Sequence, residues 1–194
     1  MRVNYYKNIF MRKLIIVNGD LATGKSHLAL IIKERFNLPL FTKDEYKEAL
    51  SEHYPYSTYE ESHKLSVMAM DMLFSSFEKV AKEDKDVVLE ANFRGEHMSK
   101  LQELVNKYHY EVLHLDLVGS TEILYQRYMN RIKYENRHPV HTVNKLDNYD
   151  AFEAYTLSRK NEKKIGNIIT INTDDLSYQK DEKLFMLIEE FLSR

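Results

Sequence analysis

The chain has 194 residues, none of them cysteine, and 43% of its residues are hydrophobic. This length fits one domain with a sizeable core, and the missing thiols exclude cysteine catalysis, disulfides and Cys-ligated zinc. Lysine and arginine (28) nearly balance aspartate and glutamate (30), so the net charge of −2 does not favour a long nucleic acid or an anionic membrane as partner. No segment reaches the roughly 18 apolar residues of a membrane span, and we expect a cytoplasmic protein.

Apolar runs and segments with helical spacing alternate along the chain. After residues 1–10, which we interpret as an N-terminal extension, a single domain is expected over 11–194. The expected strands are 14–17, 38–41, 86–89, 111–117 and 167–171. The expected helices are 25–36, 44–52, 59–82, 96–108, 120–134, 148–164 and 178–193, and the polar segment 135–147 is expected to be a loop. This alternation predicts a three-layer α/β fold with a five-stranded parallel sheet between helices.

The first strand is followed by a loop that matches the pattern G-x-x-x-x-G-K-S. It consists of Gly19, Asp20, Leu21, Ala22, Thr23, Gly24, Lys25 and Ser26. Two glycines let the backbone wrap closely around phosphate oxygens, and the helix that follows presents its positive end to the same anion. Lys25 can reach the β- and γ-phosphates, and the Ser26 hydroxyl can ligate Mg²⁺. The loop predicts a nucleoside triphosphate site, against the simpler alternative of a glycine turn.

Two short motifs suggest a different class, a GTP-binding switch. Residues 116–119 match D-x-x-G, and residues 144–147 match N-K-x-D. A motif that reads guanine should end an apolar strand, whereas residues 137–143 are mostly polar. The simpler interpretations are the end of the fourth strand and a solvated loop, so the switch remains a minor alternative.

A kinase needs a base near the acceptor hydroxyl, and in a parallel sheet such groups belong at the carboxyl ends of the strands. Asp44 follows the second strand and can accept the hydroxyl proton. Lys47, three residues later on a helix, can hold an acceptor phosphate or oxyanion. Glu90 and Asn92 at the end of the third strand can hold a Mg²⁺-bound water or the substrate. The alternatives are a helix cap at Asp44 and a capped turn at 90–92.

Three arginines precede or enter the polar segment. Arg127 and Arg131 are four residues apart and share one helix face, and Arg137 is a candidate substrate contact. They predict a lid over about 127–147 that closes on the phosphates, excludes water and neutralises the transferring group. The alternative is a solvated basic face paired with neighbouring glutamates.

From Met11 to Leu176, these features resemble the small P-loop kinases of the polynucleotide 5′-kinase, chloramphenicol phosphotransferase and zeta-toxin type. The resemblance rests on the phosphate loop and on residues 43–47, 87–93 and 127–131. It implies that Asp44 is the general base, that Arg131 is the catalytic lid arginine supported by Arg127, and that Lys47 binds the acceptor.

The resemblance also places residues 172–174, with Thr173 at their centre, near the adenine. Two positions depart from the family pattern. Lys47 stands where arginine is usual in polynucleotide kinases, so bidentate phosphate binding is not implied. Glu90 stands where aspartate is more common.

The predicted activity is transfer of the ATP γ-phosphoryl group to a hydroxyl of a small molecule or of a nucleotide or oligonucleotide end, with Mg²⁺. The catalytic residues would be Lys25, Asp44 and Arg131. The alternative is a regulatory ATP-binding NTPase without a small acceptor. The tyrosines at 46, 54, 56 and 59 either bind the acceptor or pack under a helix, and His138 with His141 belongs to a loop rather than a metal site.

Overall fold

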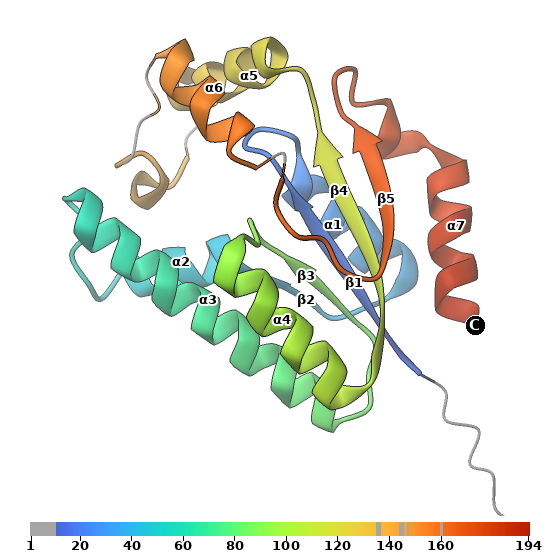
Figure 1. Cartoon of the computed structure of the whole chain (residues 1–194). Helices are drawn as coiled ribbons and strands as arrows, with labels where there is room; N and C mark the ends of the chain where they lie inside the picture. The colour runs from blue at the N-terminus through green and yellow to red at the C-terminus, as the bar shows by residue number, and fades with distance from the viewer. Residues whose placement is uncertain (1–10, 135–136, 144–145, 147, 160) are drawn as a thin grey trace, which may run out of the picture.

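The computed structural model describes residues 11–134, 137–143, 146, 148–159 and 161–194, and it has a three-layer α/β architecture (Figure 1). Five parallel strands form one sheet in the order β2-β3-β1-β4-β5. They are β1 (Arg12–Gly19), β2 (Leu40–Thr42), β3 (Val87–Glu90), β4 (Tyr110–Val118) and β5 (Asn167–Asn172). The predicted fold class is therefore confirmed.

The central strand β1 pairs with β3 on one side and with β4 on the other. Residues 13–19 of this strand are all buried, because helices cover both faces of a parallel sheet. Since the strands run in one direction, their carboxyl ends lie along one edge of the sheet. Those ends are Gly19, Thr42, Glu90, Val118 and Asn172.

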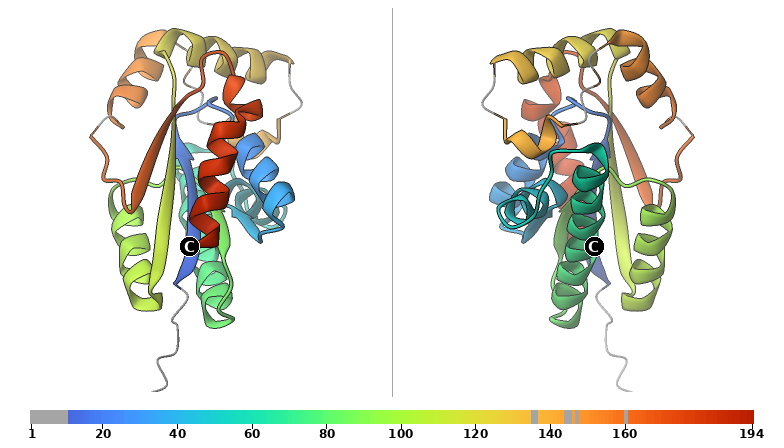
Figure 2. Two further views of the ribbon diagram at one scale, coloured as in Figure 1. Left: turned by 90° about the vertical axis from the view of Figure 1, so that its right-hand side faces the viewer. Right: turned by 90° about the vertical axis from the view of Figure 1, so that its left-hand side faces the viewer.

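Helices cover both faces of the sheet, as Figure 2 shows in two opposite views. One face packs against α1 (Lys25–Phe36) and α7 (Glu182–Ser193), and the other against α3 (Tyr59–Lys82) and α4 (Gly95–Tyr108). The first core includes Leu28 and Ile188, and the second includes Phe77 and Leu101, all fully buried. The apolar stripes on these helices thus place the sheet in the middle layer.

The remaining helices surround the carboxyl edge of the sheet. Helix α2 (Lys43–Ser51) follows β2 directly and packs against α3. Helices α5 (Thr121–Tyr134) and α6 (Tyr149–Leu157) lie above the ends of β4 and β5 (Figure 1). The buried side chains of Leu124, Tyr128 and Phe152 join α5 to α6, and two loop residues, Leu21 and Ala22, pack against them.

The structure differs from the predicted elements in the segment before β5. The predicted helix 148–164 ends at Leu157, and Ser158 and Arg159 form a turn instead. The chain has to return from α6 to the edge of the sheet. There a Cβ on Gly166 (φ +73°) would lie 2.4 Å from the Val112 carbonyl oxygen, so only glycine fits. Two short 3-10 helices, η1 (Pro139–His141) and η2 (Ser177–Lys180), replace parts of the predicted loop and last helix.

Within the described ranges, every helix is too short or too polar to traverse a bilayer. The predicted extension at residues 1–10 lies outside the described residues, as do Asn144, Lys145 and Asp147 of the N-K-x-D motif.

Candidate active site

The loop between β1 and α1 holds both glycines where a side chain would collide. At Gly19 (φ +151°) a Cβ would lie 2.3 Å from the Leu117 carbonyl oxygen, and at Gly24 (φ +85°) it would lie 2.4 Å from the Tyr178 hydroxyl. That hydroxyl donates to the Thr23 carbonyl oxygen at 3.0 Å, and the Thr23 hydroxyl donates to the Asp20 carbonyl oxygen at 2.8 Å. The loop is thus fixed from β4, from η2 and from within.

Helix α1 begins after Gly24 without a side-chain cap. By contrast, side chains cap the first turns of α2, α3, α6 and α7. An uncapped first turn leaves backbone N–H groups that can donate hydrogen bonds to an anion, and the helix dipole favours that anion. Leu21, Ala22, Gly24 and Lys25 line a cavity of about 640 Å³ at this position, which is large enough for a nucleotide.

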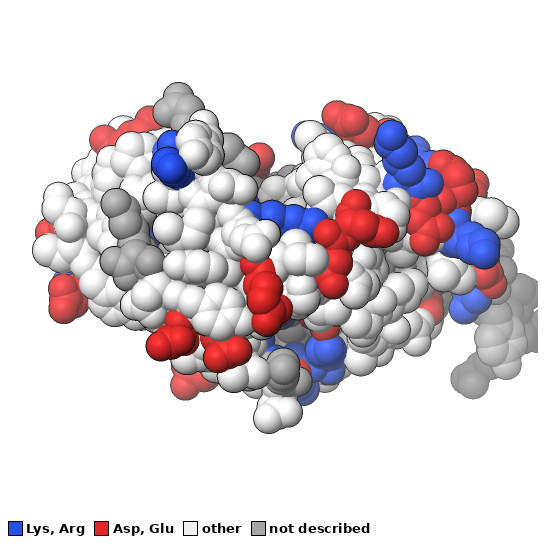
Figure 3. All heavy atoms as spheres, turned by 90° about the horizontal axis from the view of Figure 1, so that it is seen from above, with Lys and Arg blue, Asp and Glu red and all other residues white. Residues whose placement is uncertain are grey.

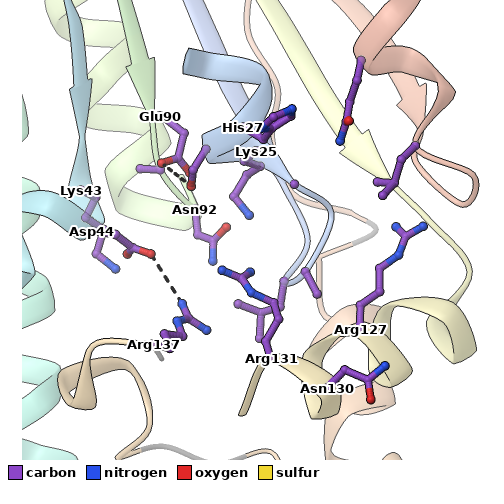
Figure 4. A pocket seen from close by; sticks show the side chains of 17 residues that line it. Lys25, His27, Lys43, Asp44, Glu90, Asn92, Arg127, Asn130, Arg131 and Arg137 are labelled. Carbon is purple, nitrogen blue, oxygen red and sulfur yellow. Dashed lines mark hydrogen bonds and ion pairs between the residues drawn. The ribbon is translucent and has the colours of Figure 1, made fainter. Parts of the chain in front are cut away.

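Lys25 projects into this cavity from the first turn of α1 (Figure 4). Its Nζ donates to the Asp20 carbonyl oxygen at 2.7 Å. Burial lowers the pKa of Lys25 to about 8, although the neighbouring Glu90 carboxylate opposes the shift. Lys25 and the uncapped turn therefore form one cationic surface.

Ser26 and Glu90 lie beside the loop and are joined by a hydrogen bond between their side chains. The Ser26 Oγ donates to Glu90 Oε2 at 3.3 Å, and Glu90 is 4% exposed. Burial raises the pKa of Glu90 to about 7, with Lys25 opposing the shift. Hydroxyl and carboxylate oxygens are ligands that Mg²⁺ accepts, directly or through water, so these residues fit the ion that the loop implies.

Asp44 is the second residue of α2, and Thr42 rather than Asp44 caps this helix. The Asp44 side chain is 45% exposed, and its Oδ2 lies 3.7 Å from Nη2 of Arg137 (Figure 4). Burial in the cleft acts to raise the pKa of Asp44, but His141, Lys43 and Arg137 together outweigh it and lower the pKa. The carboxylate is therefore held ionised at neutral pH.

Lys47 was predicted to share the cleft with Asp44. It is 6% exposed, and its Nζ donates to the Ser62 hydroxyl at 2.9 Å. Burial lowers the pKa of Lys47 to about 8, the cations Lys43 and Arg137 lower it further, and Asp44 opposes them. Lys47 is buried rather than exposed on the surface of α2, because α3 packs over it.

Three cavities meet at Asp44 and Arg137. The cavity at the phosphate loop includes both residues, and so does a second cavity of about 340 Å³. A third, of about 730 Å³, extends from them toward Glu48 and His141. The second cavity is lined by Lys43, Lys47, Asn92, Tyr59, Tyr128 and Tyr155. Asp44 thus lies where a nucleotide-sized space joins a smaller one.

Both arginines of α5 line the cavity at the phosphate loop, but their contacts differ. Arg131 lines the cavity and points toward Asn92 in Figure 4. Arg127 donates to the Thr173 carbonyl oxygen at 2.7 Å and to the Asp174 carbonyl oxygen at 2.5 Å. Thr173 itself is fully buried, and its hydroxyl donates to the Val118 carbonyl oxygen, whereas Leu176 and Gln179 from the same segment line the cavity.

Of the other predicted residues, some line a cavity and others have a packing or loop role. Asn92 lines both the nucleotide-sized cavity and the smaller one. The Tyr46 hydroxyl bonds to Ser76 at 2.6 Å, which is the packing role, whereas Tyr59 lines the smaller cavity. His141 pairs with Glu48 at 2.8 Å, and the described residues contain no cluster of three metal-ligating side chains.

Sequence reasoning missed Arg159, which it had placed inside a helix. The guanidinium is buried beneath the phosphate loop, with Nε 2.9 Å from Asp20 Oδ1 and Nη2 3.5 Å from Asp116 Oδ1. Lys164 also pairs with Asp116, at 2.5 Å. Asp116, two residues before the end of β4, thus lies inside an ion-pair cluster. The signal in the sequence was Asp20 itself, since an acid in a phosphate-binding loop requires a cation nearby.

Most of the face seen from above in Figure 3 is uncharged, with acidic and basic side chains scattered over it. Among the described residues on this face, no broad patch of one sign is present, which agrees with the near-zero net charge.

The chain matches no family model, and no curated protein resembles it in sequence. Solved structures do resemble it. A protein of Chloroflexus aurantiacus provisionally described as a kinase superposes with a TM-score of 0.80 at 25% identity, over 94% of this chain and 99% of that one. A sugar kinase from Janibacter sp. HTCC2649 gives 0.59 at 13% identity, over 92% and 95%. Shikimate kinase from Bacteroides thetaiotaomicron gives 0.58 at 18% identity, over 92% and 99%.

The chain therefore has a kinase-like α/β fold that extends over nearly its whole length. The neighbours named as kinases support a phosphotransferase. The narrower resemblance to polynucleotide kinases, chloramphenicol phosphotransferases and zeta toxins stays a prediction.

Proposed function

We propose that the protein transfers the γ-phosphoryl group of ATP to a hydroxyl group of a small anionic acceptor. The observation that carries the proposal is the position of Asp44, an ionised carboxylate where the cavity at the phosphate loop meets a smaller cavity. A base at such a junction can reach a hydroxyl in one space while the phosphoryl donor lies in the other.

In this proposal the phosphate loop and Lys25 bind the polyphosphate through N–H groups and charge. The acceptor hydroxyl gives its proton to Asp44 as its oxygen bonds to the γ-phosphorus, and the bond from that phosphorus to the bridging oxygen of ADP breaks. Arg131 stabilises the charge on the transferring group, and Arg127 holds the start of the lid against residues 173–174. Mg²⁺ beside Ser26 and Glu90 would neutralise charge on the β- and γ-oxygens.

The charges that line the smaller cavity support an anionic acceptor. Lys43, Lys47 and Arg137 bring three cations to it, and Asp44 is its one carboxylate among the described lining residues. Buried cations are stabilised when an anion pairs with them, so the excess of positive charge favours an acceptor with a carboxylate or phosphate group. Glu45 and Glu48 line the third cavity, which makes that space less suitable for an anion. Asn92, beside both spaces, would orient the acceptor.

We further propose that residues 11–194 form one kinase domain and that about 127–147 act as its lid. Arg131 and Arg137 reach the cavities from α5 and from the segment before η1, so movement of these elements would open the site and their return would exclude water. A regulatory ATP-binding NTPase is the second candidate. It is favoured only if the cavity beside Lys47 takes no acceptor.

The experiment is a transfer screen with γ-labelled ATP and Mg²⁺ over hydroxy acids, phosphorylated alcohols, nucleosides, oligonucleotide ends and neutral alcohols. We expect label on an anionic alcohol, and loss of transfer by at least about 100-fold in Asp44→Asn with ATP binding retained. Glu52→Gln at the exposed end of α2 is the control and should transfer at the wild-type rate. Equal rates for Asp44→Asn and the wild type would refute the base and favour the regulatory NTPase.

A further inference from the structure

A cluster of four charged side chains, three of them buried, lies directly beneath the phosphate loop. Two acids, Asp20 from the loop and Asp116 from β4, alternate with two cations, Arg159 and Lys164, that follow α6. The side chains of Arg159, Asp20 and Asp116 are 6%, 10% and 3% exposed. Lys164 is 31% exposed. The other three charges are therefore the ones shielded from solvent screening, and their positions affect what the loop can bind.

Asp20 is an unfavourable residue for a loop that binds polyphosphate, because its carboxylate repels the ligand. Burial raises the pKa of Asp20, and Arg159 is the largest influence that opposes the rise. Lys25 contacts the backbone carbonyl of Asp20 and not its carboxylate. Lys164 contacts Asp116. Among the described residues, Arg159 is thus the cation in direct contact with the Asp20 carboxylate, at 2.9 Å.

Arg159 also holds the backbone at the start of the loop. Its Nη1 donates to the Gly19 carbonyl oxygen at 2.6 Å and to Asn18 Oδ1 at 3.4 Å. The contact with the Asp20 carboxylate is electrostatic rather than an aligned hydrogen bond. One guanidinium therefore orients a carbonyl and neutralises a carboxylate in adjacent residues, which a lysine could not do with the same geometry.

We propose that Arg159 is a positioning residue for the nucleotide: it cancels the charge of Asp20 and fixes the Gly19 carbonyl, so that the loop presents its N–H groups and Lys25 to the phosphates. The proposal rests on the nucleotide binding assumed in the proposed function, but not on the identity of the acceptor or on transfer. It predicts that removing the charge of Arg159 and removing the charge of Asp20 have opposite effects on nucleotide affinity.

The test is calorimetric titration of the full chain with MgADP at pH 7.5. Arg159→Met leaves Asp20 uncompensated, and we expect affinity to fall about 10-fold, which corresponds to about 1.4 kcal/mol. Asp20→Asn leaves Arg159 in excess, and we expect affinity to rise about 3-fold or more. The double variant should bind more tightly than Arg159→Met and return close to the wild type.

Lys13→Met is the matched control, because Lys13 is a buried cation (5% exposed) that pairs with Glu111 at the opposite end of β1. It should leave MgADP affinity within about 2-fold even if it lowers stability. If Arg159→Met fails to fold, Asp20→Asn alone still tests the charge argument. Unchanged or weaker binding by Asp20→Asn, or a double variant no better than Arg159→Met, would overturn the proposal. Absence of phosphotransfer with MgADP binding intact would refute the kinase alone.

Discussion

Because Tyr178 lies close to Gly24, the effect of Tyr178→Phe on stability should change sign when Gly24 is replaced. Replacing Gly24 with alanine places a Cβ 2.4 Å from the Tyr178 hydroxyl, and the next atom of that ring is 3.7 Å away, an ordinary contact. The left-handed backbone (φ +85°) costs an alanine about 1–2 kcal/mol. Moving the hydroxyl away also breaks its bond to the Thr23 carbonyl, worth about 1 kcal/mol. We expect Gly24→Ala to lower the free energy of unfolding by about 2–3 kcal/mol from these two costs, and by about 1 kcal/mol more from the strain of the displaced ring.

Tyr178→Phe removes the colliding oxygen. In the wild type this change should cost about 1 kcal/mol, because the hydrogen bond to Thr23 is lost. In the Gly24→Ala background it should instead stabilise the protein, because the collision disappears, whereas the backbone cost and the loss of the bond to Thr23 are already present. Urea denaturation of the wild type, the two single variants and the double variant measures the effect of Tyr178→Phe on the free energy of unfolding in both backgrounds. MgADP titration should follow the same order, since this loop is the proposed phosphate site.

The reasoning would be refuted if Tyr178→Phe destabilised both backgrounds equally. Gly19→Ala is the matched comparison. There a Cβ meets the Leu117 carbonyl oxygen at 2.3 Å, and no side chain can be trimmed to relieve it, so we expect no second-site substitution at Tyr178 to restore MgADP binding.

Three further predictions concern charge and packing. Burial raises the pKa of Glu90 from 4.5 to about 7, so between these pH values the folded state retains a proton that the unfolded state loses. The free energy of unfolding should therefore fall as pH rises across that window, by about 3 kcal/mol at most. Urea titrations at pH 5 and 7.5 should show this fall in the wild type and a smaller one in Glu90→Gln. Parallel slopes would contradict this. Burial lowers the pKa of Lys47 to about 8, so the KM for an anionic acceptor should rise above pH 8. Lys47→Arg, which stays charged, should remove that rise. A KM independent of pH in the wild type would exclude acceptor binding by Lys47. Tyr46→Phe should cost about 1 kcal/mol through its lost bond to Ser76 and leave MgADP affinity unchanged, and a changed affinity would place Tyr46 in the site.

Local sequence patterns predicted the phosphate loop and most of the strands and helices. The apolar run at residues 14–17 is a strand buried on both faces, and the loop pattern from Gly19 to Ser26 joins it to a helix, as predicted. Both depend on neighbouring residues and on general rules of burial and phosphate binding. The strand assignments also gave the parallel sheet, because alternating strands and helices leave few other connections.

The end of α6 shows where local patterns were insufficient. Residues 148–164 have no residue that forbids a helix, yet the helix stops at Leu157, because the chain must reach the edge of the sheet beside Val112. That turn brings Arg159 to Asp20, 139 positions earlier in the sequence. Likewise, the enclosure of Lys47 depends on α3, which packs against α2 and supplies Ser62.

The sequence by itself determined the chemical groups at the site: a glycine loop with its lysine and serine, and acids at the ends of two strands. Only the tertiary structure decided which of them share a cavity, which cation faces which acid, and how deeply each is buried. The physical reason is that residue type and backbone preference act over a few neighbouring residues, whereas electrostatic pairing and desolvation depend on distances between segments that meet only in the folded chain.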